Sequence, residues 1–168
     1  MTISSMKVRA SIIGVLTKAV DAGTASIDIE QIVNNTLTDG TGADQGNAVY
    51  VDDFSIGASS SSTIDLAGSL SDPLGNTIVF TAVKAILIIA DDTNVNNVIV
   101  GNATNAFVGP FGAGTHTLAI KPGGVLLVTD GFSAAGWTVG AGSTDELKLA
   151  NSSSGTAVTG TIVVIREA

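Results

Sequence analysis

The sequence predicts an all-β protein built as an antiparallel β-sandwich, with an N-terminal extended arm or edge strand. Apolar residues recur mostly at every second position, which is typical of strands with one face in water. Turn-forming stretches follow one another at intervals of roughly 8 to 12 residues, the spacing of an all-β sandwich. No segment after residue 47 has a convincing helical period. We therefore expect residues 1–35 to form the arm or first strands, and residues 36–168 to form one β-sandwich domain.

The first 20 residues fit two patterns. On a helix, Val8, Ile12 and Leu16 would share one face, but Val8, Ala10 and Ile12 also alternate as in a strand. Gly14 and several β-branched residues weaken the helix, so we favour an extended arm or strand. Such an apolar arm could reach a neighbouring subunit, although an ordinary edge strand of the same domain explains the pattern equally well. The residues expected to make the contact are Val8, Ile12, Ile13, Val15 and Leu16.

The glycine-rich stretch "LTDGTGADQGN" at 37–47 resembles a nucleotide-binding loop only at first sight. Its glycines at 40, 42 and 46 miss the G-x-G-x-x-G spacing. A dinucleotide loop must also open a helix whose N-terminus faces the pyrophosphate, whereas "NAVYVDDF" follows here and alternates as a strand. We interpret the loop as a turn that uses the conformational freedom of glycine.

Five further stretches are expected to be strands. Residues 25–30, 62–68 and 145–151 alternate strictly enough to have one wet face. Residues 83–90, apart from Lys84, and residues 159–167 are apolar on both faces, so both should be well buried and 83–90 should be a central strand. In the turns at 72–76 and 121–124 a proline precedes a glycine that can adopt positive φ. The remaining turns are expected at 109–114, 129–131, 140–145 and 151–155.

The composition excludes several classes of protein. There is no cysteine, so disulfides and thiolate metal sites are ruled out. The net charge is −8 and the seven basic residues are scattered, so nucleic acid is not an expected partner. The longest apolar run, at 85–90, is far shorter than the ~20 residues of a membrane-spanning helix, so no membrane partner is expected. We therefore expect the surplus of apolar residues to fill a core and to make subunit contacts.

No stretch of the sequence matches a complete motif for catalysis, metal binding or cofactor binding. Residues 92–97 resemble a calcium loop, but Asn97 replaces the required glycine and Ala103 replaces the bidentate glutamate. The alternative that stays open is a looser calcium site built from several loops. The G-x-S-x-x-G stretch at 131–136 is one residue longer than a nucleophile elbow. The only histidine, His116, has no local carboxylate or cysteine. We expect no catalytic residue, no cofactor and no enzyme activity.

The acidic pairs and the single tryptophan remain as weaker candidates. Asp52–Asp53, Asp91–Asp92 and Asp145–Glu146 fall at strand edges or turns, where solvated charges are normal. Paired carboxylates are also the catalytic groups of glycosidases, so a glycosidase stays an open alternative. Sugar sites usually contain aromatic side chains, and only seven of the 168 residues are aromatic. Trp137 is the one aromatic that could form a sugar platform, but a core or interface tryptophan is the better interpretation.

Several stretches, in this order along the chain, resemble a family of small virion structural proteins from tailed bacteriophages. They lie at 40–53 ("GTGADQGNAVYVDD"), 62–88, 95–107, 120–124 ("IKPGG") and 147–165. The resemblance covers about residues 37–168 and leaves the N-terminal segment uncovered. The chain departs from the family at its end, "IREA", where many similar sequences close near a glycine.

The resemblance implies a jelly-roll-like sandwich on the surface of the virion. The expected function is that of a capsid decoration (cement) protein that clamps neighbouring major capsid subunits, with the major capsid protein and other copies of the chain as partners. A trimer would suit that role. The alternative is a tail- or fibre-associated module that binds host glycans through Trp137 and the loops at 91–97 and 109–114. A hydrolase that uses the acidic pairs is a third hypothesis.

Overall fold

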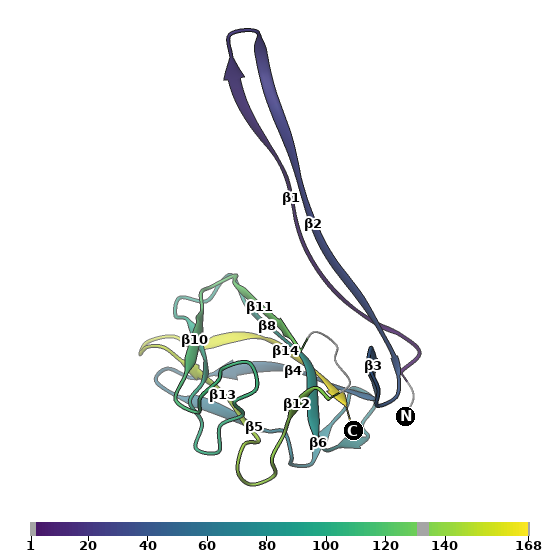
Figure 1. Cartoon of the computed structure of the whole chain (residues 1–168). Helices are drawn as coiled ribbons and strands as arrows, with labels where there is room; N and C mark the ends of the chain where they lie inside the picture. The colour runs from purple at the N-terminus through teal and green to yellow at the C-terminus, as the bar shows by residue number, and fades with distance from the viewer. Residues whose placement is uncertain (1–2, 131–134, 168) are drawn as a thin grey trace.

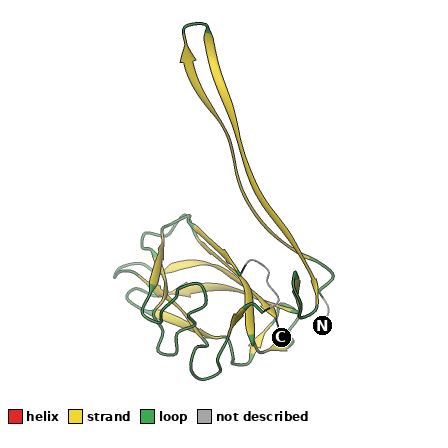
Figure 2. Ribbon diagram, viewed as in Figure 1, coloured by secondary structure: helices red, strands yellow, loops and turns green. Residues whose placement is uncertain are grey.

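The computed structural model describes residues 3–130 and 135–167, which form a two-layered β-sandwich with a long hairpin that projects from it (Figures 1 and 2). The all-β prediction is confirmed, since every regular element among these residues is a strand. Within the same ranges there is no helix long and apolar enough to cross a membrane. Most of the G-x-S-x-x-G stretch at 131–136 lies outside the described residues.

The hairpin is formed by the first two strands, which pair antiparallel over their whole length. These are β1 (Met6–Val20) and β2 (Gly23–Asp39). The pairing runs from Met6 opposite Leu37 to Val20 opposite Gly23, with only Asp21 and Ala22 in the turn. The extended conformation favoured for the first segment is therefore present, and its partner is the next stretch of chain. The hairpin ends at Asp39, beyond the boundary expected at residue 35.

Two antiparallel sheets form the body. The large sheet has the order β11 (Val125–Thr129), β8 (Ala82–Ala90), β14 (Val158–Glu167), β4 (Ala48–Ile56), and β12 (Trp137–Thr138) also pairs with β8. The small sheet has the order β10 (Thr117–Ile120), β9 (Val98–Gly101), β13 (Glu146–Asn151), β5 (Ser61–Asp65). The stretches 83–90 and 159–167 are the inner strands of the large sheet, as their two-sided apolar pattern predicts.

The strand pairs of the body are nested. β9 pairs with the next strand along, β10, and outside this pair β8 pairs with β11. Further out, β5 pairs with β13, and β4 pairs with β14. These four strand pairs thus follow the course of one long antiparallel ribbon folded over into two layers.

The core lies between the two sheets and contains the inward-facing apolar residues of both. Alternation places Ile86 and Ile88 of β8 and Ile162 and Val164 of β14 on this side, where each is at most 1% exposed. The largest other apolar side chains of this core with almost no exposure are Phe80, Phe107, Leu66, Leu147 and Leu149.

Short ladders and turns complete the body. β6 (Leu70–Ser71) and β7 (Thr77–Ile78) flank the turn at 72–76. There Gly75 has φ 83° and its N–H donates to the Asp72 carbonyl at 2.9 Å, which confirms the predicted turn. The Asn76 side chain donates a hydrogen bond to the Asp72 carboxylate, and this lowers the pKa of Asp72 despite its burial. At 121–124 the Gly124 N–H donates to the Lys121 carbonyl at 2.8 Å, closing the second predicted proline turn.

The glycine-rich loop connects the hairpin to the body. Gly40 has φ 140°, a conformation that favours glycine, and the Gln45 side chain folds back to accept a hydrogen bond from the Gly42 N–H at 2.8 Å. The two-residue β3 (Gln45–Gly46) pairs parallel with the end of β2. The loop then continues into β4 rather than a helix, so its described structure is that of a turn.

One feature of the core has no counterpart in the sequence predictions. Lys84 is fully buried, and its Nζ lies 2.8 Å from Glu167 and 3.7 Å from Asp130. The register of β8 against β14 shifts here, because Ile165 opposes Ala85 while Arg166 opposes Val83. Lys84 is therefore the extra residue of a β-bulge, which turns its side chain toward the two carboxylates.

Candidate functional site: the projecting hairpin and its base

The two faces of the hairpin differ in polarity. Residues paired directly across the two strands share a face, and successive residues alternate between faces. We call one the apolar face; it contains Met6, Val8, Ala10, Ile12, Leu16, Val20, Ala25, Ile27, Ile29, Val33 and Leu37, interspersed with Lys18, Gln31 and Asn35. The other, the polar face, contains Lys7, Arg9, Ser11, Thr17, Ser26, Asp28, Glu30, Asn34 and Thr36. An apolar patch of Ile13, Val15 and Ile32 interrupts the polar face.

Beyond its base the hairpin contacts nothing else that the structure describes. Ile12 is 73% exposed, Leu16 is 63% exposed and Ile27 is 65% exposed. A two-stranded ribbon in water is marginally stable on its own, and a contiguous exposed apolar surface usually marks a site of interaction. The projecting hairpin is therefore the leading candidate for the functional site.

The base of the hairpin is held firmly against the body. On the apolar face Met6, Val8 and Leu37 pack on Ala85, Ile165 and Leu127 of the large sheet. Val8 is 8% exposed and Leu37 is completely buried. The N–H of Ile3 also donates to the Asp39 carboxylate at 3.0 Å. The apolar face thus begins as an intramolecular interface and continues outward without a partner.

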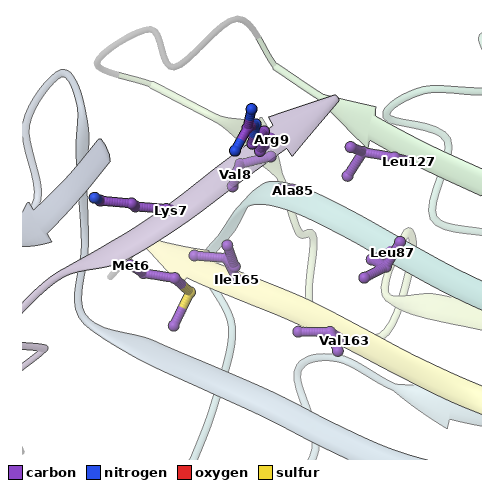
Figure 3. Close-up of a pocket in the computed structure, with 9 residues that line it drawn as sticks. All are labelled: Met6, Lys7, Val8, Arg9, Ala85, Leu87, Leu127, Val163 and Ile165. Carbon is purple, nitrogen blue, oxygen red and sulfur yellow. The ribbon is translucent and has the colours of Figure 1, made fainter. Parts of the chain in front are cut away.

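Beside this contact lies an apolar groove of about 310 Å³ on the outer face of the large sheet, the face turned away from the small sheet (Figure 3). Its floor beside the hairpin is made by Leu87, Leu127 and Val163, one residue from each of three neighbouring strands, and Leu127 also contacts the hairpin base. Lys7 and Arg9 of β1 border it. The groove therefore combines an apolar floor with a cationic margin.

One row of the uncovered outer face is apolar across the whole sheet. The register aligns Val51, Val163, Leu87 and Leu127 in one row across the four strands. The row toward the hairpin base is Val49, Ile165, Ala85 and Thr129, and the row on the far side is Asp53, Thr161, Ile89 and Val125. Val51 is 40% exposed, Ile89 39% and Val125 61%. Apart from the contact of the hairpin base with Leu127, no described element covers the Val51 row or the Asp53 row.

The structure divides the predicted contact residues among three surroundings. Val8 is buried at the base, Ile12 and Leu16 lie on the apolar face, and Ile13 and Val15 lie on the polar face. The sequence prediction missed the contribution of β2. It treated residues 25–30 as a strand with only one wet face, but Ile27 is 65% and Ile29 43% exposed, so that expectation of burial is wrong. The Asp21-Ala22-Gly23 turn between two alternating runs could have indicated the hairpin.

Trp137 belongs to the edge of the core. It pairs with Val83 in the large sheet, is half-buried and packs against the core cluster. The backbone of Gly109 abuts its side chain, so the loop at 109–114 begins next to it. The loop at 91–97 is instead bound to other segments, since Asn94 bonds to both backbone groups of Thr159 and the Asn97 N–H donates to Ser152. Among the residues that the structure describes, no contact joins both loops to Trp137.

The acidic pairs are separated by the alternation of strands or engaged in turns. Asp52 accepts a hydrogen bond from Tyr50 at 2.9 Å, while Asp53 on the opposite face accepts one from Thr161 at 2.6 Å. Burial, reinforced by the bond to Asp52, raises the pKa of Tyr50. The Asp91 carboxylate accepts from Thr159 at 2.5 Å, and Asp145 binds the N–H of Gly142. Each of these carboxylates has a structural partner.

The remaining polar candidates have local roles. The Glu146 carboxylate accepts a hydrogen bond from the Asn105 N–H at 2.9 Å. His116 is exposed, and its Nδ1 lies 2.6 Å from the Phe111 carbonyl. Among residues 3–130 and 135–167 no group of three or more His, Cys, Asp or Glu side chains is placed to hold a metal ion.

Comparisons with protein-family models, with curated proteins and with solved structures found no match for this chain.

Proposed function

We propose that this chain is a non-enzymatic virion structural protein, a capsid decoration protein that clamps neighbouring major capsid subunits. The observation that carries the proposal is the hairpin, whose apolar residues extend well clear of the body that presents them. A protein that works by contact needs such a reach, whereas a catalyst needs converging polar groups. The sequence resemblance to phage virion proteins is the reason for proposing the phage capsid as the surface that the hairpin contacts.

The strand order supports the jelly-roll assignment. The nested pairs β4–β14, β5–β13, β8–β11 and β9–β10 are distributed over two sheets, as in a long ribbon wrapped into a double Greek key. Jelly rolls of eight strands are common in viral capsid proteins, which agrees with the proposed role. Fold alone does not decide function, so the argument depends on the hairpin.

We assign contact with the capsid to the polar face of the hairpin. A decoration protein must stay dissolved until it meets the particle, so its contact surface should resemble an ordinary, partly polar protein surface. The patch of Ile13, Val15 and Ile32, surrounded by charged and hydroxyl side chains, fits that description. Burying such residues contributes about 25 cal/mol per Å² before the costs of association are subtracted.

The first experiment is quantitative protein staining of purified virions. Hundreds of copies per particle, in simple proportion to the major capsid protein, are expected for a decoration protein. A few dozen copies would move the chain to the neck, tail or fibre, and absence from the particle would overturn the proposal. The glycan-binding alternative has less support because the Trp137 side chain is half-buried and packs against the core of the body.

The second experiment tests the assigned face with purified full-length chain added to particles that lack it. The double variant Ile13→Ser/Val15→Ser should bind about tenfold more weakly or worse, because each lost apolar contact is worth more than 1 kcal/mol. The matched control is Ser11→Ala/Thr17→Ala, which changes the same face outside the patch. Equal binding by both variants would contradict the assignment.

A further inference from the structure

Each chain carries two large apolar surfaces without a partner. One is the apolar face of the hairpin beyond Ala10, and the other is the outer face of the large sheet beyond the hairpin base. Neither surface is suited to permanent contact with water, because contiguous apolar surfaces of this kind are typical of obligate interfaces between subunits and not of free protein surfaces. Both surfaces belong to the same molecule, so a second copy supplies the missing partner for each.

The chain already shows how these two surfaces fit together. At the base, Met6, Val8 and Leu37 of the apolar face pack on Ala85 and Ile165 of the outer face. The next row of the sheet, from Val51 to Leu127, has the same character and borders the same contact. The next residues of the apolar face, Ala10 and Ile12, lie on the same side of the hairpin as the residues that pack on the sheet at its base. A hairpin placed over the open row would continue an interface that exists.

The hairpin that covers this row must come from another molecule. β1 crosses the outer face at Met6–Arg9 and then leads away from the body, so its distal part cannot lie on its own sheet without reversing at the base (Figures 1 and 3). The length is sufficient: residues 10–20 extend about 35 Å at ~3.4 Å per residue, whereas four strands at ~4.8 Å spacing are about 15–20 Å wide.

The charges bordering the two surfaces are complementary. Lys18 is the one charged residue on the apolar face, and Asp53 occupies the edge of the receiving sheet. Like charges are thus not forced together, and these two groups can form a rim ion pair that sets orientation more than affinity.

We propose that the outer face of the large sheet is the docking site for the apolar face of the hairpin of a second copy of this chain. The contact is heterologous, hairpin to sheet, so it either closes reciprocally between two chains or runs around a cyclic ring. The inference goes beyond the capsid role and does not depend on it. It also leaves the patch of Ile13, Val15 and Ile32 free on the outside of the assembly.

The test is the molar mass of purified chain in solution, measured by size exclusion with light scattering at micromolar concentration. The unmodified chain should be a closed oligomer. Ile12→Ser/Leu16→Ser on the hairpin and Val51→Glu on the sheet should each reduce the mass to that of one 16.7 kDa chain. Both sites are already exposed, so these variants should keep the thermal transition of a folded body.

Two matched controls separate docking from a general effect of polarity. Ile13→Ser/Val15→Ser alters the other face of the same hairpin, and Val79→Glu alters a valine that is 42% exposed but lies outside the four strands. Both should keep the oligomeric mass. The proposal is wrong if the unmodified chain is monomeric, or if the controls dissociate the assembly as readily as Ile12→Ser/Leu16→Ser and Val51→Glu do.

A crosslinking experiment identifies the surfaces directly. Because the chain contains no cysteine, Leu16→Cys in one tagged chain and Val51→Cys in a differently tagged chain introduce the only thiols. Mixing the two should give a crosslink between tags, and Leu16→Cys paired with Val79→Cys should not. A monomeric chain whose Ile12→Ser/Leu16→Ser variant loses particle binding would instead assign the apolar face to the capsid and overturn self-docking.

Discussion

The hairpin and the body have the same sequence pattern but opposite surroundings. Leu16 in the hairpin and Leu149 in the body both lie on the apolar face of a regular strand, yet Leu16 is 63% exposed and Leu149 is completely buried. The difference is that the body has a second layer and the hairpin has none. A period of two therefore specifies a strand and its faces, but the layer that covers a face depends on the rest of the molecule.

The same contrast explains where the stability of the molecule lies. Between the sheets, buried side chains lose their contact with water on folding, and this is the main favourable contribution to stability. The hairpin gains this benefit at its base, through residues such as Val8 and Leu37. Substitutions in the two regions should therefore differ strongly, and each prediction below uses the Val51→Glu chain so that self-association does not enter.

The largest difference is expected between two lysines. Lys84→Met removes the cation between the buried carboxylates of Asp130 and Glu167, and should lower the free energy of unfolding by about 3–5 kcal/mol. Lys18→Met in the exposed hairpin should change it by less than about 0.5 kcal/mol. Urea denaturation of the two variants measures both values. A loss below about 1 kcal/mol for Lys84→Met would show that the ion cluster is not important for stability.

A smaller difference is expected between the two leucines. Leu149→Ala leaves a cavity in the core and should cost about 2–5 kcal/mol. Leu16→Ala removes a side chain that contacts mostly water, so its effect on unfolding should stay within about 0.5 kcal/mol. Chemical denaturation again reports both. If Leu16→Ala proved as costly as Leu149→Ala, the hairpin would have to pack on its own body in solution.

The smallest difference is expected between two glycines with open space around them. Gly75 has φ 83°, so Gly75→Ala should cost about 1–2 kcal/mol through backbone strain alone, and Gly75→Asn should cost less. Gly14 has no such φ, so Gly14→Ala should cause no loss of stability in thermal denaturation. A loss at Gly14 equal to that at Gly75 would indicate that the hairpin strand is distorted.

Features that depend on a few neighbouring residues could be predicted from the sequence. The turns at 72–76 and 121–124 follow from proline and glycine chemistry, and the inner position of β8 follows from its apolar residues on both faces. The ion cluster of Lys84 could not be predicted, because Asp130 follows β11, Glu167 ends β14, and a bulge in β8 brings Lys84 within reach of both. Such long-range placement is not contained in local patterns.

Only one part of the candidate site, the apolar residues of the first strand, could be predicted from the sequence. Ile12 and Leu16 were identified from their apolar spacing, but the alternation that places Ile13 and Val15 on the other face was not used to separate two surfaces. The receiving surface was missed for a different reason. Two-sided apolarity in residues 83–90 indicates burial on both sides, whereas the structure of one chain leaves Leu87 and Ile89 outside the core.

The nested pairing of the body also determines the order in which the chain can fold. The hairpin pairs adjacent stretches of chain, and such ribbons form within about 1–10 μs. β14, by contrast, lies between β4 and β8 and is translated after both of them. Until it leaves the ribosome, those two strands cannot be bridged. The large sheet is therefore assembled only after β14 has been made, while the hairpin can already be complete.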